Sequence, residues 1–206
     1  MDGVVSDTQI LHSQSESQLL SNYGINLSPA EITKRFAGMK TSEFFGELLK
    51  EKNIKINLTS LIDKKWQKMI ELAQKSVSPM PGAINLINQF LKDGLKLGLA
   101  SASTLKYIKI VLLKLNLENK FQTVVSADEV KRGKPEPDIF LKTAKKLFLK
   151  PNECVVIEDG ISGMIAAKRA KMKCVGLTTD EKQNNYPADI IVKSLNELTI
   201  EKILRI

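Results

Sequence analysis

Cysteine, aromatic residues and long apolar runs are all scarce in this 206-residue chain. With only two cysteines, the sequence offers no disulfide framework and favours a reducing, cytoplasmic setting. No apolar run reaches the ~18 residues that suggest a membrane-spanning helix. The first seven residues also lack the basic and apolar segments of a secretory signal. We therefore expect a cytoplasmic protein that does not enter the membrane.

Aromatic residues make up only 5% of the chain, although its formal net charge is +8. The excess charge comes from lysines spread over predicted helix faces, with no basic stretch interleaved with aromatic side chains. Single-stranded nucleic acids are usually bound by positive charge combined with aromatic stacking platforms. We therefore expect no nucleic-acid partner. We also expect a monomer. The lysines are interpreted as solvated surface that would also attract a phosphorylated small molecule.

The hydrophobic pattern divides the chain into two regions. Residues 8–78 are predicted to be almost entirely helical, with a capping box at Ser28 and Glu31. After a segment rich in proline and glycine, helices alternate with short apolar strands at residues 95–100, 123–125, 153–157, 174–177 and 190–192. Such alternation is typical of βαβ units and a parallel sheet. We expect a three-layer α/β/α core formed by residues 1–7 plus 79–206, with residues 8–78 inserted as an all-helical domain.

Two adjacent carboxylates, Glu158 and Asp159, follow an apolar strand and precede Gly160 and a predicted helix. In open parallel sheets, ligands bind at the carboxyl ends of the strands. Two neighbouring acids repel each other unless a cation lies between them, and Mg²⁺ prefers oxygen ligands. A solvated acidic turn at a helix N-terminus would use the same residues. This motif alone leaves both interpretations open.

Three further stretches fall at expected strand ends or in the loops that follow. Ser101 and Ala102 end a strand before a predicted helix, where they could bind an anion or serve the helix start. Lys134 precedes prolines that can aim it inward, and Asp2 with Gly3 resembles the end of a strand. Together they supply acids for a metal, a hydroxyl for phosphate oxygens and a cation for developing charge. This is the equipment of metal-assisted phosphoryl transfer.

These motifs occur in the order and at the spacing of the haloacid dehalogenase superfamily. The matching stretches are Asp-Gly-Val at residues 2–4, Ala-Ser-Ala-Ser at 100–103, Gly-Lys-Pro-Glu-Pro at 133–137 and Glu-Asp-Gly-Ile-Ser-Gly at 158–163. The chain resembles the subgroup of β-phosphoglucomutase-like enzymes and sugar-phosphate phosphatases over essentially its whole length. The resemblance implies a Rossmann-like core, a mobile helical cap and Mg²⁺ as cofactor.

The resemblance also implies a role for each matching residue. Ser101 and the Ala102 amide would bind the phosphate, and Lys134 would bridge the phosphate and the nucleophile. Asp159 would bind Mg²⁺, and Glu158 would support the metal through water. Asp2 would act as general acid and base, with its backbone carbonyl on the metal.

One departure concerns the nucleophile. In the family, the first motif is an apolar strand ending in Asp-X-Asp-Gly, and its first aspartate becomes phosphorylated. Here Met1 occupies the position of that aspartate. We expect either a misassigned start codon or a trimmed sequence, with Met1 as an internal methionine. The missing strand should lie mid-sheet, between the strands that end near Ser101 and Glu158. As written, the chain should form no aspartyl-phosphate.

Three residues of the cap are candidates for substrate recognition. His12 corresponds to a histidine that faces the site in mutase-like relatives, although a half-buried surface histidine would fit the sequence equally. Lys40 and Thr41 match a cap loop that contacts substrate in relatives, and Lys40 could equally be solvated. Thr41 stands where β-phosphoglucomutase has an arginine for the second phosphate. This difference favours a phosphatase over a mutase.

The sequence therefore predicts a Mg²⁺-dependent phosphatase of a small phosphorylated metabolite, with a sugar phosphate as the expected substrate. Two alternatives stay open: a β-phosphoglucomutase-like phosphohexomutase and a catalytically silent protein that binds a phosphometabolite. A requirement for a bisphosphate would favour the mutase, and release of free phosphate without one would favour hydrolysis.

Overall fold

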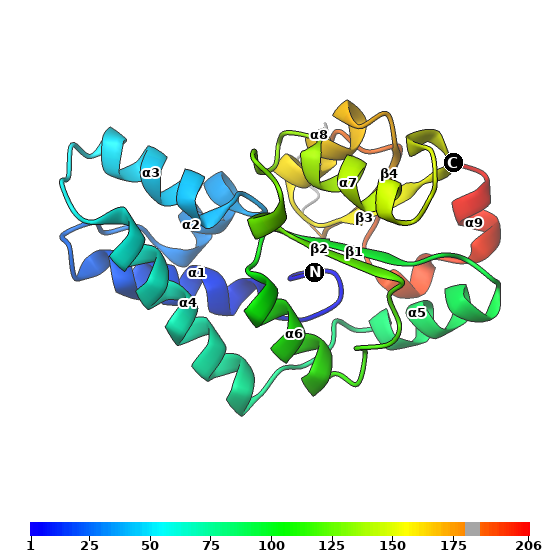
Figure 1. Cartoon of the computed structure of the whole chain (residues 1–206), viewed down its shortest axis with the longest axis horizontal. Coiled ribbons are helices and arrows are strands. Elements are labelled where there is room, and N and C mark those ends of the chain that lie inside the picture. The colour runs from blue at the N-terminus through cyan, green and yellow to red at the C-terminus, as the bar shows by residue number, and fades with distance from the viewer. Residues whose placement is uncertain (180–185) are drawn as a thin grey trace.

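The computed structural model describes residues 1–179 and 186–206 and shows a helical group beside an α/β group (Figure 1). The helical group contains α1 (Gln9–Ser21), α2 (Pro29–Phe36), α3 (Thr41–Glu51) and α4 (Leu58–Lys75). The α/β group follows with α5 (Ala83–Lys92), β1 (Gly98–Ser101), α6 (Leu105–Lys114), β2 (Thr123–Ser126), α7 (Asp138–Lys146), β3 (Val155–Glu158), α8 (Ile161–Arg169), β4 (Lys173–Leu177), β5 (Ile190–Val192) and α9 (Ile200–Leu204). Short 3₁₀ turns lie at η1 (Ala127–Glu129), η2 (Pro151–Glu153) and η3 (Leu195–Glu197). This order confirms the predicted α/β fold with a helical insertion.

Side-chain caps start two of the inserted helices. At α2, Ser28 Oγ accepts a hydrogen bond from the Glu31 amide at 3.3 Å, and Glu31 Oε2 accepts one from the Ser28 amide at 2.8 Å. At α4, Asn57 Oδ1 accepts from the Ser60 amide at 3.0 Å. The first turn of a helix has amide groups without a partner inside the helix, and these caps satisfy some of them. The predicted capping box is therefore present.

The inserted helices share an apolar cluster of their own. Its buried members come from α1 to α4 and the connections between them: Leu20, Ile25, Ile32, Phe36, Phe44, Phe45, Leu48, Leu49 and Leu61. Phe44 lies between two aromatic neighbours, with its ring centroid 4.4 Å from that of Phe36 and 4.7 Å from that of Phe45. We call these four helices the cap. The division into residues 8–78 and residues 1–7 plus 79–206 as separate domains stays a prediction.

The two connections between the cap and the α/β group run side by side. The Asp7 amide donates to the Ser78 carbonyl at 2.9 Å, and the Met80 amide donates to the Val5 carbonyl at 3.0 Å. The chain therefore leaves the α/β group and returns to it through one paired crossing. This pairing holds the N-terminal residues in place against the α/β group.

All strand pairs in the described residues are parallel. β1 pairs with β2 in one sheet, and β3, β4 and β5 form another in that order. Helices α7 and α8 pack on one side of the strands, while α5, α6 and α9 lie on the other side (Figure 1). The strands thus form the middle of three layers, and their carboxyl ends face the cap.

β1 and β3 belong to different sheets, and an apolar cavity of about 320 Å³ lies between them. Its lining includes Gly98, Leu99 and Ala100 of β1 and Val155 to Glu158 of β3. Met1 and Val5 also contribute to the lining. The cavity lies at the position where sequence analysis expected the first strand of the family.

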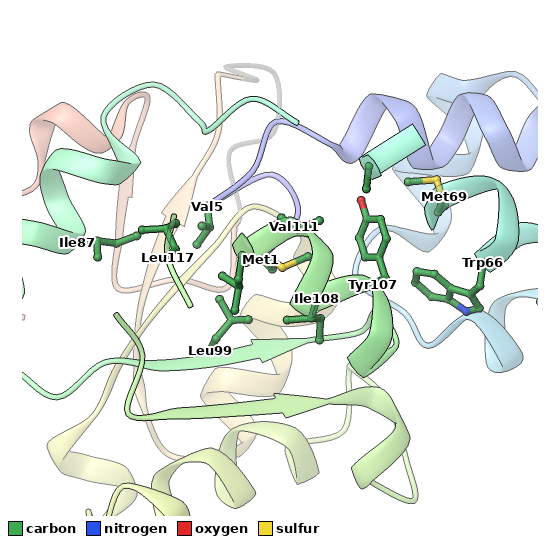
Figure 2. Close-up of a cluster of buried hydrophobic side chains, with 12 residues drawn as sticks. Met1, Val5, Trp66, Met69, Ile87, Leu99, Tyr107, Ile108, Val111 and Leu117 are labelled. Carbon is green, nitrogen blue, oxygen red and sulfur yellow. The ribbon is translucent and has the colours of Figure 1, made fainter. Parts of the chain in front are cut away.

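The N-terminal residues are part of a buried apolar cluster that joins the cap to the α/β group. Figure 2 shows Met1 and Val5 in the middle of this cluster, with Trp66 and Met69 of α4 facing Tyr107 of α6 at one end. Burial of Met1 and Val5 fixes the loop between them. That loop carries Asp2, so packing of the cluster positions a predicted site residue.

Among the described residues, no helix combines the length and the apolar character needed to cross a membrane.

Candidate active site

A cavity of about 70 Å³ lies between the cap and the carboxyl ends of β1 and β3. The structure brings nearly all of the predicted site residues into its lining: Asp2, His12, Thr41, Ser101, Ala102, Lys134, Glu158 and Asp159. These residues come from positions far apart in the sequence. Their convergence follows from the parallel strands, whose ends meet at one edge of the α/β group.

Lys40 is the exception among the predicted residues. Its Nζ atom donates to the Val130 carbonyl at 3.3 Å, so the side chain ties the cap to the loop that leads to Lys134. Lys40 does not contribute to the cavity lining in the described residues. The expected contact of Lys40 with substrate stays a prediction, and in this structure the side chain joins the cap to the α/β group.

Two more hydrogen bonds join the same regions. Glu43 Oε1 accepts from the Gly133 amide at 2.8 Å, and Ser162 Oγ donates to the Ala37 carbonyl at 2.5 Å. Gly38 lies between them with a φ of +80°, and a Cβ added there would lie 2.8 Å from Ser162 Oγ. A left-handed glycine without a side chain therefore lets the cap loop approach α8 closely.

Asp2 lies between the cap and the end of β1. Its Oδ1 atom accepts from Thr8 Oγ1 at 2.6 Å and lies 3.2 Å from His12 Nε2, while Oδ2 accepts from Ser103 Oγ at 2.9 Å. Burial alone would raise the pKa of Asp2, but attraction to His12 and the hydrogen bonds outweigh it and hold the pKa well below its usual value. The carboxylate is therefore ionised at neutral pH, which is the form that can accept a proton.

Lys134 and Glu158 form a buried ion pair, with side chains only 4% and 7% exposed. The Glu158 carboxylate also accepts from the amides of Asp159 at 3.0 Å and Gly160 at 3.2 Å. Burial would raise the pKa of Glu158, but the ammonium of Lys134, the N-terminal amine and the hydrogen bond from the Gly160 amide lower it below the usual value. Glu158 is thus satisfied by Lys134 and by backbone amides, and it holds the ammonium at the cavity.

Asp159 has the opposite electrostatic environment. Burial, and then repulsion from Glu158, raise the pKa of Asp159 to about 8. Gly3 allows this carboxylate to approach the N-terminal loop, because a Cβ added at Gly3 would lie 1.9 Å from Asp159 Oδ2. The N-terminal amine and Lys134 pull the pKa of Asp159 down, but they do not outweigh burial and Glu158, so Asp159 is a buried carboxyl that is only partly compensated by cations.

This donor set fits Mg²⁺. Mg²⁺ is usually bound by one or two carboxylates, together with waters and substrate phosphate, so it needs no cage of protein ligands. The described residues contain no group of three histidine, cysteine or acidic side chains suited to a metal. Asp159 is the carboxylate available for direct binding, since Lys134 already engages Glu158. A cation at Asp159 would offset the burial and the repulsion from Glu158 that together raise its pKa.

Ser101 and Ala102 lie where β1 ends and the turn into α6 begins. Ser101 is buried, and its Oγ atom accepts from the Ser103 amide at 3.2 Å. A serine hydroxyl that accepts one hydrogen bond can still donate its proton to another acceptor. Ser101 can therefore donate to an anion held in the cavity beside Lys134.

Sequence reasoning missed the two charged residues that the described part of the cap adds to the cavity lining besides His12, namely Glu16 of α1 and Lys65 of α4. Each occupies a buried helix face: Glu16 lies four residues after His12 on α1, and Lys65 lies four residues after Leu61 on α4. Residues four apart share a helix face. A charged residue within such a buried face was the signal in the sequence that could have identified them.

These groups lie at the ends of parallel strands, beneath a helical insertion. This arrangement is that of the haloacid dehalogenase class of phosphoryl-transfer enzymes. The family model described as haloacid dehalogenase-like hydrolase matches residues 1–177. The chain therefore belongs to this family, and its relatives include phosphatases and phosphomutases.

Several curated relatives match almost the whole chain. Hexitol phosphatase B of Escherichia coli is 28% identical over 208 residues, covering 99% of this chain and 94% of that protein. Beta-phosphoglucomutase of Bacillus subtilis is 28% identical over 208 residues, covering 98% of this chain and 90% of that protein. Among solved structures, beta-phosphoglucomutase of Clostridium difficile has a TM-score of 0.87 at 29% identity, covering 99% of this chain and 92% of that chain. The similarity thus extends through both the cap and the α/β group.

Proposed function

We propose that this protein is a Mg²⁺-dependent phosphatase that acts on a small phosphorylated metabolite, with a sugar or hexitol phosphate as substrate. The observation that carries the proposal is the convergence of Asp2, Ser101, Lys134 and Asp159 on one cavity beneath the cap. The similarity to a hexitol phosphatase supports the substrate class.

In this proposal, Lys134 and Ser101 bind the phosphate oxygens and orient the phosphoryl group. Glu158 keeps the Lys134 ammonium aimed at the cavity. When bound at Asp159 and the Asp2 carbonyl, Mg²⁺ supplies positive charge that stabilises the charge developing on the phosphoryl oxygens. These residues stabilise the transferring group without themselves becoming phosphorylated.

Asp2 is the proposed general acid and general base. Its carboxylate accepts the proton of the attacking water when the phosphoenzyme is hydrolysed, and in the first half-reaction the protonated form donates to the leaving alkoxide. Thr8, His12 and Ser103 hold the carboxylate in place through the contacts described above. The ionised state that these contacts favour corresponds to the hydrolytic half-reaction.

The nucleophile is proposed to be an aspartate at the position that Met1 occupies. Met1 lies beside Asp2 in the cavity lining, so a carboxylate at this place would lie next to the groups that bind the phosphate. An apolar strand leading to it would fill the 320 Å³ cavity and could pair with the facing edges of β1 and β3. Buried backbone groups of those edges would then gain hydrogen-bond partners.

The test compares the 206-residue chain with two extended forms. Each extended form carries an added apolar strand and a residue in place of Met1, either Asp or, as the matched control, Asn. Phosphate release from sugar and hexitol phosphates is measured with and without Mg²⁺. We expect release only from the Asp form and only with Mg²⁺. Equal release from the Asn form would contradict the proposed nucleophile.

The same assay separates the alternatives. The relatives named β-phosphoglucomutase keep a phosphohexomutase as the second candidate. Isomerisation of a hexose phosphate that depends on an added bisphosphate would establish it. Binding of phosphate by the Asp form without turnover of any substrate would favour a silent binding protein.

A further inference from the structure

Within the described residues, the cap contributes one carboxylate and one ammonium to the cavity lining. Glu16 Oε1 lies 3.4 Å from Lys65 Nζ, and Lys65 Nζ also donates to Thr41 Oγ1 at 3.3 Å. The ammonium lies 3.5 Å from the centroid of the Trp66 ring. Glu16 is 8% exposed and Lys65 is 2% exposed, and both line the same cavity as Ser101. The roof of the cavity therefore carries an acceptor and a donor side by side.

Stability alone gives no reason for this pair. Desolvating two charges is costly, and replacing a buried ion pair by packed apolar residues is often neutral or stabilising. On α4 the neighbouring positions of the same face, Leu61 and Met69, are apolar and buried, so an apolar residue at position 65 would continue that face. On α1 the buried face is mixed, with His12 on one side of Glu16 and Leu20 on the other. The charged pair therefore points to recognition of a ligand in the cavity.

The chemistry of the pair selects the ligand. A hydroxyl group can donate to the Glu16 carboxylate and accept from the Lys65 ammonium, so neighbouring hydroxyls of a polyol chain satisfy both groups. A second phosphate would be disfavoured at this place. Its oxygens accept hydrogen bonds from Lys65, but its negative charge would be repelled by the Glu16 carboxylate. Lys65 is the one lysine or arginine that the cap contributes to the cavity lining in the described residues, and Glu16 compensates its charge.

We propose that Glu16 and Lys65 form a hydroxyl-recognition pair that selects polyhydroxylated monophosphates and disfavours bisphosphates. This proposal rests on the proposed function, since the floor of the same cavity would hold the phosphate. It also revises the role of the position at Thr41: the Thr41 hydroxyl does not replace a cation but helps to orient the Lys65 ammonium.

The test measures binding in the presence of Mg²⁺ to three probes: inorganic phosphate, sorbitol 6-phosphate and glucose 1,6-bisphosphate. The variants Glu16→Gln and Lys65→Met are made in the full chain and in its strand-extended form. Lys68→Met, at an exposed position of α4, is the matched control. A double variant, Glu16→Met with Lys65→Met, leaves no unpaired buried charge and guards against loss of folding.

We expect both single variants to bind sorbitol 6-phosphate about tenfold more weakly or worse, because each leaves a hydroxyl without its charged partner. Inorganic phosphate should bind as it does to the parent protein. The two variants should change the affinity for the bisphosphate in opposite directions. Glu16→Gln should strengthen bisphosphate binding, and Lys65→Met should weaken it. The double variant should bind phosphate but lose the preference for sorbitol 6-phosphate.

Three results decide against the proposal. It is overturned if the parent protein binds phosphate without preferring sorbitol 6-phosphate, or if the single variants leave that preference intact. It is also overturned if both single variants weaken the bisphosphate equally, because that is the result of general damage to the cap. If the parent forms bind none of the probes, the proposed function fails together with this inference.

Discussion

The floor and the roof of the cavity are built in different ways. The floor consists of residues at strand ends and the loops beside them, where Lys134, Glu158 and backbone amides hold one another in fixed positions. The roof consists of single residues on helix faces, with Glu16 from α1, Lys65 from α4 and Thr41 from α3. The floor thus carries groups suited to the common chemistry of the phosphoryl group. The roof carries groups that can vary with the rest of the substrate.

The comparison teaches which functions can change independently. Changes on the floor should affect binding of every phosphate, whereas changes on the roof should affect one substrate relative to another.

Replacing Lys134 by Met should have the largest effect on stability. The change leaves the Glu158 carboxylate buried without its ion-pair partner, which typically costs about 3–5 kcal/mol of unfolding free energy. Urea denaturation of the parent and the variant measures this loss. The double variant Lys134→Met with Glu158→Gln should recover part of it. If Lys134→Met unfolds at the same urea concentration as the parent, the ion pair contributes nothing and the account of the floor is wrong.

Replacing Asp159 by Asn should remove the response to Mg²⁺. Because Asp159 has a pKa raised to about 8, the folded protein without metal holds it largely protonated at pH 7, and the neutral amide resembles that form. The variant without metal should therefore be at least as stable as the parent. Mg²⁺ should raise the melting temperature of the parent but not that of Asp159→Asn. An equal rise in both proteins would exclude Asp159 as the metal ligand.

The affinity for Mg²⁺ should increase with pH. Metal binding requires ionised Asp159, so below a pKa of about 8 each pH unit should strengthen binding by about tenfold, and the gain should level off above it. Without metal, the folded state binds more protons at Asp159 than the unfolded state between pH 3.8 and about 8. This carboxyl therefore contributes a loss of stability as pH rises through that window. Calorimetric titrations at pH 6, 7, 8 and 9 measure the affinity, and a flat profile would contradict the prediction.

Removing a helix cap on the roof side should have the smallest effect. Ser28→Ala removes the hydroxyl of the capping box of α2, which should cost about 1 kcal/mol of unfolding free energy. Phosphate binding should not change, because Ser28 does not line the cavity. Ser21→Ala is the control, since its exposed hydroxyl bonds only to the Gln18 carbonyl at 2.8 Å. Loss of phosphate binding in Ser28→Ala would show that floor and roof are not independent.

The floor could largely be predicted from the sequence. Strands such as β3 are short apolar runs, and the residues directly after them are brought together by the parallel topology. Glu158 and Asp159 are adjacent in sequence, so predicting the end of their strand was enough to predict the position of both residues. Their unequal pKa values could not be predicted, because these depend on which carboxylate Lys134 meets in space.

The roof could be predicted only in part. The helices were predicted from their periodicity and caps, but the faces that point to the cavity depend on how α1 and α4 pack. Glu16 and Lys65 come from separate helices, and sequence separation hides their contact. Lys40 shows the same dependence on packing, because its loop lies at the cavity while its long side chain extends to Val130.

The central claim is that the floor of the cavity transfers phosphoryl groups. The most direct measurement is phosphate release from sorbitol 6-phosphate by the strand-extended Asp form with Mg²⁺, compared with the same form carrying Asp159→Asn. We predict that the parent form releases phosphate and that the variant does not. Equal release by both forms would contradict the claim.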